Sequence, residues 1–308
     1  MHFLILTDFL CSNGGPMRDE QSIFEDHIHP LKPIPTGETP TDLARIRHVA
    51  AMVFDVYGTL LISGSGEKNP PDMHSSQKRV LAGVLQRYGI DHTPESLMND
   101  LQGTIEKTHE DLRQEGIDYP EVDIVRVWET ILGVRDTNWL KTFALEYEMV
   151  VNPVYPMPGL GDLLTVCREQ NLLLGVISNA QFFTPRLLQH MLGATLEMSG
   201  IDPQLIFYSY RFKNAKPSTL MFRRAVTAFS RRGILPTSVL YVGNDMRNDI
   251  LPAKKVGFQT VLFAGDRRSL RRRADDVSCR HLTPDAIVTD LRQLIAVLGS
   301  PSDRRQHG

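Results

Sequence analysis

The chain has 308 residues, which allows one large domain or a core with a smaller inserted one. Hydrophobic residues make up 42% and charged residues 23%, as in a soluble globular protein, and the formal net charge is -2. This balance gives no sign of a nucleic-acid or membrane partner. The 3 cysteines fit neither a zinc site nor a disulfide framework, which suits a reducing compartment. We therefore expect a cytoplasmic protein, and we leave its oligomeric state open.

Residues 1–47 contain several prolines and glycines and show little periodicity, so we expect an irregular N-terminal leader. Its first apolar stretch is short and lacks a preceding positive charge, which makes it a poor signal peptide. Met17 is an alternative start to Met1, and the sequence leaves that choice open. At the other end, we expect residues 300–308 to form a tail.

A short apolar run at residues 48–54 predicts the first strand. Because the run is short, apolar and bounded by Asp55 and a turn signal at Gly58, we expect this strand to be buried on both faces. Residues 62–154 then show apolar positions at helical spacing in four stretches with no strand between them. Two of these stretches end at Gly89 and Gly133, as helices commonly do. We therefore predict an α-helical cap inserted at residues 62–154.

From residue 158 onward, helix and strand patterns alternate. We expect strands near residues 172–177, 205–207, 239–242, 260–263 and 286–288, and helices near 162–169, 219–230, 248–256 and 290–298. Such alternation predicts an α/β fold with a doubly wound, Rossmann-like parallel sheet. This core is expected to comprise residues 48–61 and 155–299.

Polar residues follow two of the predicted strands, at the sheet edge where open parallel sheets bind ligands. Asp55 could act as a nucleophile or a metal ligand, although a turn aspartate is also a common helix cap. Ser178 and Asn179 could hydrogen-bond an anionic oxygen, although a simple turn explains them equally well. Each of these signals is weak when taken alone.

Two further groups are Lys216, which precedes a proline, and the pair Asp245 and Asp249. A lysine there could neutralise the charge of a phosphate, although most lysines are solvated and Lys213 is a competitor. The two aspartates lie one helical turn apart, and their oxygens suit Mg²⁺. The alternative to a metal-binding role is a structural one, in which the two aspartates stabilise the N-terminus of a helix.

In this order, the four groups resemble the motifs of the haloacid dehalogenase-like hydrolase superfamily. The matching segments are Asp55 to Leu60, Ser178–Asn179, Lys216–Pro217 and Gly243 to Asp249. The resemblance implies that Asp55 forms a covalent ester with the substrate while Lys216 and Ser178 stabilise the charge. It also implies substrate binding by Asn179. In the phosphatase branch, it implies Mg²⁺ bound by Asp55, by the backbone carbonyl of Tyr57, and by Asp245 or Asp249.

Two positions depart from the phosphatase pattern. Tyr57 stands where phosphatases of the family usually have a second aspartate as general acid and base, and tyrosine there resembles the metal-independent 2-haloacid dehalogenases. Asn244 stands where the fourth motif often has its first acid, so either Asn244 or Asp245 fills that position. Dehalogenases of the family use a cap arginine, for which Arg126 is the nearest candidate, although a structural explanation fits better, in which Val127 and Trp128 pack while Arg126 extends its charge to solvent. The arginines of residues 267–273 are expected to form a solvated arm or an interface.

The sequence therefore predicts a Mg²⁺-dependent phosphohydrolase that acts on a small phosphate ester through an aspartyl-enzyme intermediate. One alternative is a metal-independent 2-haloacid dehalogenase-type hydrolase. The other is a catalytically weak binding module of the same fold.

Overall fold

The computed structural model describes residues 18–66 and 73–298. In this part of the chain, a six-stranded sheet has the order β5-β4-β1-β6-β7-β8, and every neighbouring pair is parallel. Its strands are β1 (Ala51–Phe54), β4 (Leu173–Ser178), β5 (Ile201–Tyr208), β6 (Val239–Gly243), β7 (Gln259–Phe263) and β8 (Ala286–Val288). Each expected strand is present, so the α/β fold is confirmed.

Helices cover both faces of the sheet because β1 is apolar on both. Met52 and Phe54 belong to one apolar cluster, and Ala51 and Val53 belong to the other, since successive side chains of a strand point to opposite faces. The first cluster is completed by α6 (Leu160–Glu169), α7 (Thr184–Leu192) and η4 (Leu291–Leu298), and the second by α9 (Leu220–Ser230) and α10 (Leu251–Lys255). The short helix α8 (Ser209–Phe212) follows β5. This is the doubly wound arrangement that the sequence predicts.

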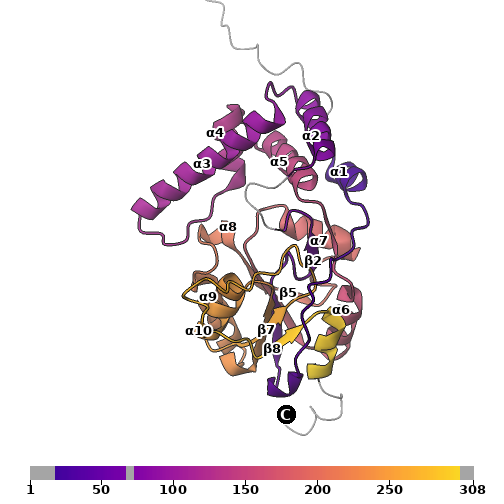
Figure 1. Cartoon of the computed structure of the whole chain (residues 1–308), viewed down its shortest axis with the longest axis vertical. Helices are drawn as coiled ribbons and strands as arrows, with labels where there is room; N and C mark the ends of the chain where they lie inside the picture. Colours follow the sequence, from indigo (N-terminus) through magenta and orange to yellow (C-terminus); the bar gives the residue numbers. More distant parts are fainter. Residues whose placement is uncertain (1–17, 67–72, 299–308) are drawn as a thin grey trace, which may run out of the picture.

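The cap helices lie together beyond one end of the sheet, at the top of Figure 1. They are α2 (Ser75–Arg87), α3 (Pro94–Gln114), α4 (Ile124–Leu132) and α5 (Thr137–Val151). Trp128 packs edge-on against Phe143 and Tyr147 in their shared apolar cluster. Where the chain leaves and re-enters the core, β2 (Leu61–Ser63) and β3 (Val154–Pro156) pair antiparallel. This pair was not predicted, and it coincides with the expected cap boundaries at residues 62 and 154.

The N-terminal segment is more regular than expected. We predicted an irregular leader, but α1 (Glu20–His27) forms within it, capped by Asp19, and η1 (Leu43–Arg45) follows. Ile23 and Phe24 of α1 are buried, and the helix lies beside α5 of the cap (Figure 1). A helix of two turns offers too short a pattern for sequence periodicity to detect. The two candidate start codons and the tail at residues 300–308 lie outside the described residues.

A buried carboxylate ties α1 to the cap. Glu146 of α5 is fully buried and accepts hydrogen bonds from Arg18 Nη1 at 2.7 Å and from the Tyr88 hydroxyl at 2.9 Å. Arg87 also pairs with it, and His27 Nε2 lies 3.3 Å from its Oε1. Burial raises the pKa of Glu146, but the hydrogen bonds from His27, Tyr88 and Arg18 lower it to about 2. In the described residues, no helix has both the length and the apolar character needed to span a membrane.

Candidate active site

Asp55 lies at the carboxyl end of β1, near the middle of the sheet. Its backbone N–H donates to the carbonyl of Val242 at 2.9 Å, which extends the β1–β6 pairing by one residue. Its side chain is only 5% exposed, and its Oδ1 accepts a hydrogen bond from Lys216 Nζ at 2.7 Å. None of the described residues donates to Asp55 Oδ2, so this oxygen is the one available to react with a ligand.

Lys216 joins two buried carboxylates. Its Nζ lies 2.7 Å from Asp55 Oδ1 and 2.6 Å from Asp249 Oδ1. Burial alone would lower the pKa of Lys216, but the charges of Asp249 and Asp55 raise it above its ordinary value, so the side chain stays cationic. Asn179 fixes the lysine backbone, because its Oδ1 accepts from Lys216 N at 2.7 Å and its Nδ2 donates to Lys216 O at 3.4 Å. Lys216, and not its competitor Lys213, is therefore the lysine of the site.

The turn after β6 presents Asp245 and Asp249. Residues Met246–Ile250 form a π-helical turn, η3, which places the two aspartates on the same side of the chain. A Cβ atom at Gly243 would lie 2.4 Å from Asp249 Cγ, so only glycine leaves room for this carboxylate. Asp249 Oδ2 accepts from Asp245 N at 2.9 Å, and its Oδ1 accepts from the Tyr241 hydroxyl at 2.9 Å as well as from Lys216. Both oxygens of Asp249 therefore face protein donors.

Asp245 is held by an arginine. Arg273 Nη2 lies 2.6 Å from Asp245 Oδ2, and Arg273 Nε lies 3.1 and 3.2 Å from Oδ1 and Oδ2. Asp245 Oδ1 also accepts hydrogen bonds from two backbone N–H groups of η3. We expected the arginines of residues 267–273 to form a solvated arm or an interface; Arg267 and Arg272 are exposed, whereas Arg273 pairs with Asp245. The structure differs because the loop after β7 returns across the end of β6, where Met246 N donates to Arg271 O at 2.9 Å.

Asn244 has a structural role. Its Oδ1 accepts from Thr59 Oγ1 at 3.0 Å, and its Nδ2 donates to Ser269 O at 2.8 Å. It thereby ties the loop after Asp55 to the loop after β7. The turn at Gly58 has a φ of 77°, and a Cβ atom there would lie 2.8 Å from Asn244 Nδ2, which explains the glycine. Of the two candidates for the first acid, Asp245 is the one that lines the cavity.

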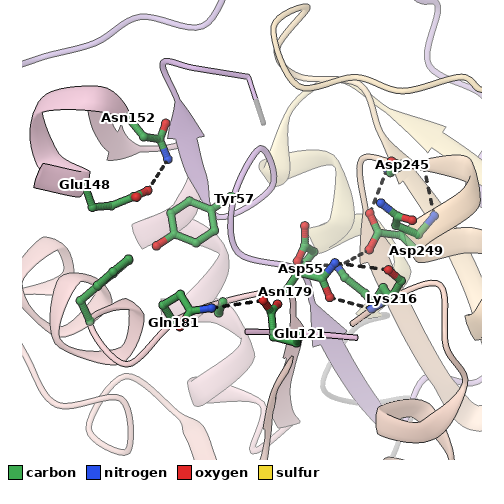
Figure 2. A pocket seen from close by; sticks show the side chains of 13 residues that line it. Asp55, Tyr57, Glu121, Glu148, Asn152, Asn179, Gln181, Lys216, Asp245 and Asp249 are labelled. Atoms are coloured by element: carbon green, nitrogen blue, oxygen red, sulfur yellow. Dashed lines mark hydrogen bonds and ion pairs between the residues drawn. The ribbon is translucent and has the colours of Figure 1, made fainter. Parts of the chain in front are cut away.

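A cavity of about 350 Å³ lies between the core and the cap (Figure 2). Its lining, among the described residues, is Asp55, Tyr57, Glu121, Glu148, Asn152, Asn179, Ala180, Gln181, Phe183, Lys216, Asp245, Asn248 and Asp249. Five carboxylates and one lysine thus face the cavity in the described part of the chain. Ser178 is not in this lining, and its Oγ donates to Asn179 O at 3.3 Å, so its catalytic role stays a prediction.

Tyr57 and two cap glutamates set the character of the cavity. The Tyr57 hydroxyl lies 3.0 Å from Thr184 Oγ1, and burial together with the charges of Glu148 and Asp55 raises the pKa of Tyr57. Tyr57 is therefore a neutral phenol at physiological pH and is not a base. Burial also raises the pKa of Glu148, whose Oε1 accepts from Asn152 Nδ2 at 3.1 Å. The sequence analysis missed Glu121 and Glu148, because nothing in their local pattern distinguishes them from other glutamates of the cap.

The oxygen donors predicted for Mg²⁺ have the right chemistry but are not assembled as a site. Among the described residues, no group of three or more His, Cys, Asp or Glu side chains is arranged to hold a metal. Asp55 and the Tyr57 carbonyl remain candidates, but Asp245 pairs with Arg273 and would have to leave it to bind a cation. Asp249 holds Lys216, so a role in orienting the lysine suits it better than the metal role we predicted.

The cap arginine considered for a dehalogenase lies elsewhere. The Arg126 side chain is 76% exposed and pairs with Glu129 at 2.7 Å. It is absent from the described residues that line the cavity. Arg126 is therefore a solvent-exposed side chain and is not placed to hold a haloacid in the cavity.

The model of the haloacid dehalogenase-like hydrolase family matches residues 49–257, and the chain belongs to this family of hydrolases. A phosphoglycolate phosphatase from Xylella fastidiosa (strain Temecula1 / ATCC 700964) is 26% identical over 219 residues, which are 71% of this chain and 81% of the relative. The fold is shared by structures with different activities. A HAD phosphatase from Thermococcus onnurineus has a TM-score of 0.50 and 18% identity, covering 82% of this chain and 98% of the other. A 2-haloacid dehalogenase from Pseudomonas syringae pv. Tomato DC3000 has a TM-score of 0.50 and 17% identity, covering 81% and 98%.

Proposed function

We propose that this hydrolase cleaves a small phosphate ester with the help of Mg²⁺, through an ester formed on Asp55. The observation that carries the proposal is the pairing of Asp55 Oδ1 with the buried ammonium of Lys216, which leaves Oδ2 unpaired at a cavity. A carboxylate held in this way has one oxygen fixed and the other oriented to attack. The phosphoglycolate phosphatase relative supports phosphate as the group transferred.

The charge of the cavity favours a phosphatase over a dehalogenase. Among the described residues that line the cavity, Asp55, Asp245 and Asp249 face the single ammonium of Lys216, even without Glu121 and Glu148, whose pKa values burial raises. An anionic substrate enters such a site only if positive charge is added, which a divalent cation can do for a phosphate. A metal-independent dehalogenase would need a protein cation for the carboxylate of its substrate, and Arg126 is exposed to solvent instead.

Each residue of the site has a distinct role in the proposed reaction. Asp55 Oδ2 attacks the phosphorus atom, and Lys216 holds Asp55 Oδ1 in place while it balances the developing charge. Asn179 fixes the backbone of Lys216, and Asp249 fixes its ammonium. Mg²⁺, when bound, would neutralise phosphate oxygens, and Asp55, the Tyr57 carbonyl and Asp245 would hold it once Arg273 releases Asp245.

A screen of small phosphate monoesters with and without Mg²⁺ tests the proposal. Wild-type protein should release phosphate in Mg²⁺, and Asp55→Asn should not, since an amide cannot form the ester. A second readout is the thermal unfolding temperature, which should rise with Mg²⁺ and beryllofluoride together, because beryllofluoride on Asp55 mimics the phosphorylated aspartate. The absence of both effects would favour a binding module.

A metal-independent 2-haloacid hydrolase is the second candidate, because Tyr57 replaces the usual second aspartate and Arg273 occupies Asp245. Halide release from a 2-haloacid in the presence of a chelator, with no phosphate release from any ester, would establish this candidate and overturn the phosphatase proposal.

A further inference from the structure

The proposed phosphatase reaction needs a proton donor for the leaving oxygen, and Tyr57 does not supply one. A carboxyl two residues after Asp55 is missing, and the raised pKa of the Tyr57 phenol, caused first by burial, removes it as a base. Either the reaction proceeds without this help, or another group provides it. Among the described residues of the cavity wall, the titratable side chains of Glu121 and Glu148 have no part in the steps given above.

Glu121 is such a side chain. It lies in the cap just before α4, and it lines the same cavity as Asp55. Its Oε2 accepts a hydrogen bond from Ser209 Oγ at 2.6 Å, and its Oε1 accepts from Gln181 Nε2 at 3.2 Å and from Val122 N at 3.0 Å. Figure 2 shows it beside Asn179 and Gln181, whereas the ring of Tyr57 lies between Glu148 and Asp55 in this view.

The segment that carries Glu121 is fixed to the core loop that leads to Lys216. Ala215 N donates to Tyr119 O at 2.7 Å, and Glu121 N donates to Lys213 O at 3.2 Å. Gln181 strengthens this contact, because its Nε2 also donates to Val122 O at 2.9 Å. The position of Glu121 relative to the catalytic lysine is therefore set by backbone hydrogen bonds to the core, although Glu121 belongs to the cap.

The ionisation of Glu121 suits proton transfer at neutral pH. Burial raises the pKa of Glu121 to about 7, in spite of the hydrogen bonds from Ser209 and Val122. A group with a pKa near the working pH can both give and accept a proton. The ionisable groups that share the cavity with it are Asp55, Tyr57, Glu148, Lys216, Asp245 and Asp249. Glu148 is the nearest rival, but it lies on the far side of Tyr57 from Asp55 in Figure 2.

We propose that Glu121 is the general acid and base of this hydrolase, replacing the carboxyl that is missing at position 57. The inference rests on the proposed phosphatase function. In the first step, Asp55 Oδ2 bonds to phosphorus, the ester P–O bond breaks, and Glu121 gives its proton to the leaving oxygen. In the second step, water bonds to phosphorus and loses a proton to Glu121, and the bond from phosphorus to Asp55 breaks. Phosphate leaves, and both side chains return to their starting states.

Leaving-group dependence distinguishes this role from a structural one. With an alkyl phosphate, Glu121→Gln should lose about 10²–10⁴-fold in kcat/KM, because a poor leaving group needs the proton. With p-nitrophenyl phosphate, the first step should survive while the second is slowed. The variant should then release a rapid burst of nitrophenolate, about one per enzyme, before slow turnover. The wild type should show no such burst.

Two further variants keep the test independent of folding. Glu148→Gln removes the other cap carboxylate of the cavity and should show neither the burst nor the selective loss on alkyl phosphates. Ser209→Ala removes a donor that lowers the pKa of Glu121, so the acidic limb of its kcat profile should move to higher pH. Equal losses on both substrates in Glu121→Gln, or wild-type kinetics in that variant, would overturn the role of Glu121 alone. Failure of the wild type to hydrolyse any phosphate ester would overturn the phosphatase function and this inference together.

Discussion

Replacement of Arg273 by glutamine should strengthen Mg²⁺ binding about tenfold. Arg273 contacts both oxygens of Asp245 at 2.6 to 3.2 Å, so a cation must displace it before using that carboxylate. A hydrogen bond between charged groups contributes about 1.5–3 kcal/mol. Because the Arg273 side chain is 35% exposed, solvent screens the pair and the lower end applies. About 1.4 kcal/mol corresponds to a tenfold change in affinity.

Isothermal titration of Mg²⁺ into wild-type and variant protein measures this effect without relying on turnover. Arg272→Gln is the matched control, because it removes the same charge from the neighbouring residue. Arg272 pairs instead with Glu38, with N–O distances of 2.7 and 2.8 Å, and does not contact Asp245. The control should bind Mg²⁺ as the wild type does. The refuting result is a folded Arg273→Gln variant that binds Mg²⁺ with the same affinity as the wild type. In that case Arg273 does not compete with Mg²⁺ for Asp245, and Asp245 is not a metal ligand.

Three other substitutions test the site and its support. Lys216→Met should abolish turnover and lower the free energy of unfolding more at pH 7 than at pH 5. Burial raises the pKa of Asp249 to about 6, so at pH 5 its protonation relieves the repulsion from Asp55 that the variant no longer balances. An equal loss at both pH values would argue against this charge pairing. Glu146→Gln should cost at most about 3 kcal/mol of unfolding free energy at pH 7, because the pKa of Glu146 falls from 4.5 to about 2 on folding. That contribution is present above about pH 4.5 and is lost as the pH falls toward 2, so urea titrations of both proteins should converge in acid. Tyr57→Phe keeps the backbone carbonyl and should leave phosphatase turnover and Mg²⁺ affinity within about threefold of wild type. A large loss of turnover in this variant would show that the phenol has a catalytic role.

The parts of the fold that the sequence predicts are those with a strong local signal. The run at Ala51–Phe54 is apolar at every position, and each of its side chains is buried in the structure. The helices α2 to α5 have regular apolar spacing and lie close to their expected positions. The strands β2 and β3 have three residues each, which is too short for an alternating pattern to stand out. Their pairing depends on residues far apart in the chain.

Within the site, the sequence predicts the residues that belong to strand ends. Asp55 and Asn179 directly follow β1 and β4 and converge because the carboxyl ends of parallel strands meet at one edge of the sheet, and Lys216 reaches the same edge from the loop between α8 and α9. Arg273 could not be predicted, because a run of arginines near several aspartates is typical of a solvated surface. Glu121 could not be predicted either, since its place at the cavity depends on how the cap packs against the core.

Glu121 and Asp245 each bear on one of the two departures from the family's phosphatase pattern. The carboxyl missing at Tyr57 has a counterpart in Glu121, which reaches the cavity from the cap. The acid displaced from position 244 has a counterpart in Asp245, whose charge Arg273 balances. Both counterparts depend on loops outside the strand ends, the first on residues 119–122 and the second on the loop after β7. Because neither loop belongs to the short motifs, the motifs alone show neither Glu121 at the cavity nor the pairing with Arg273 that a cation at Asp245 would have to displace.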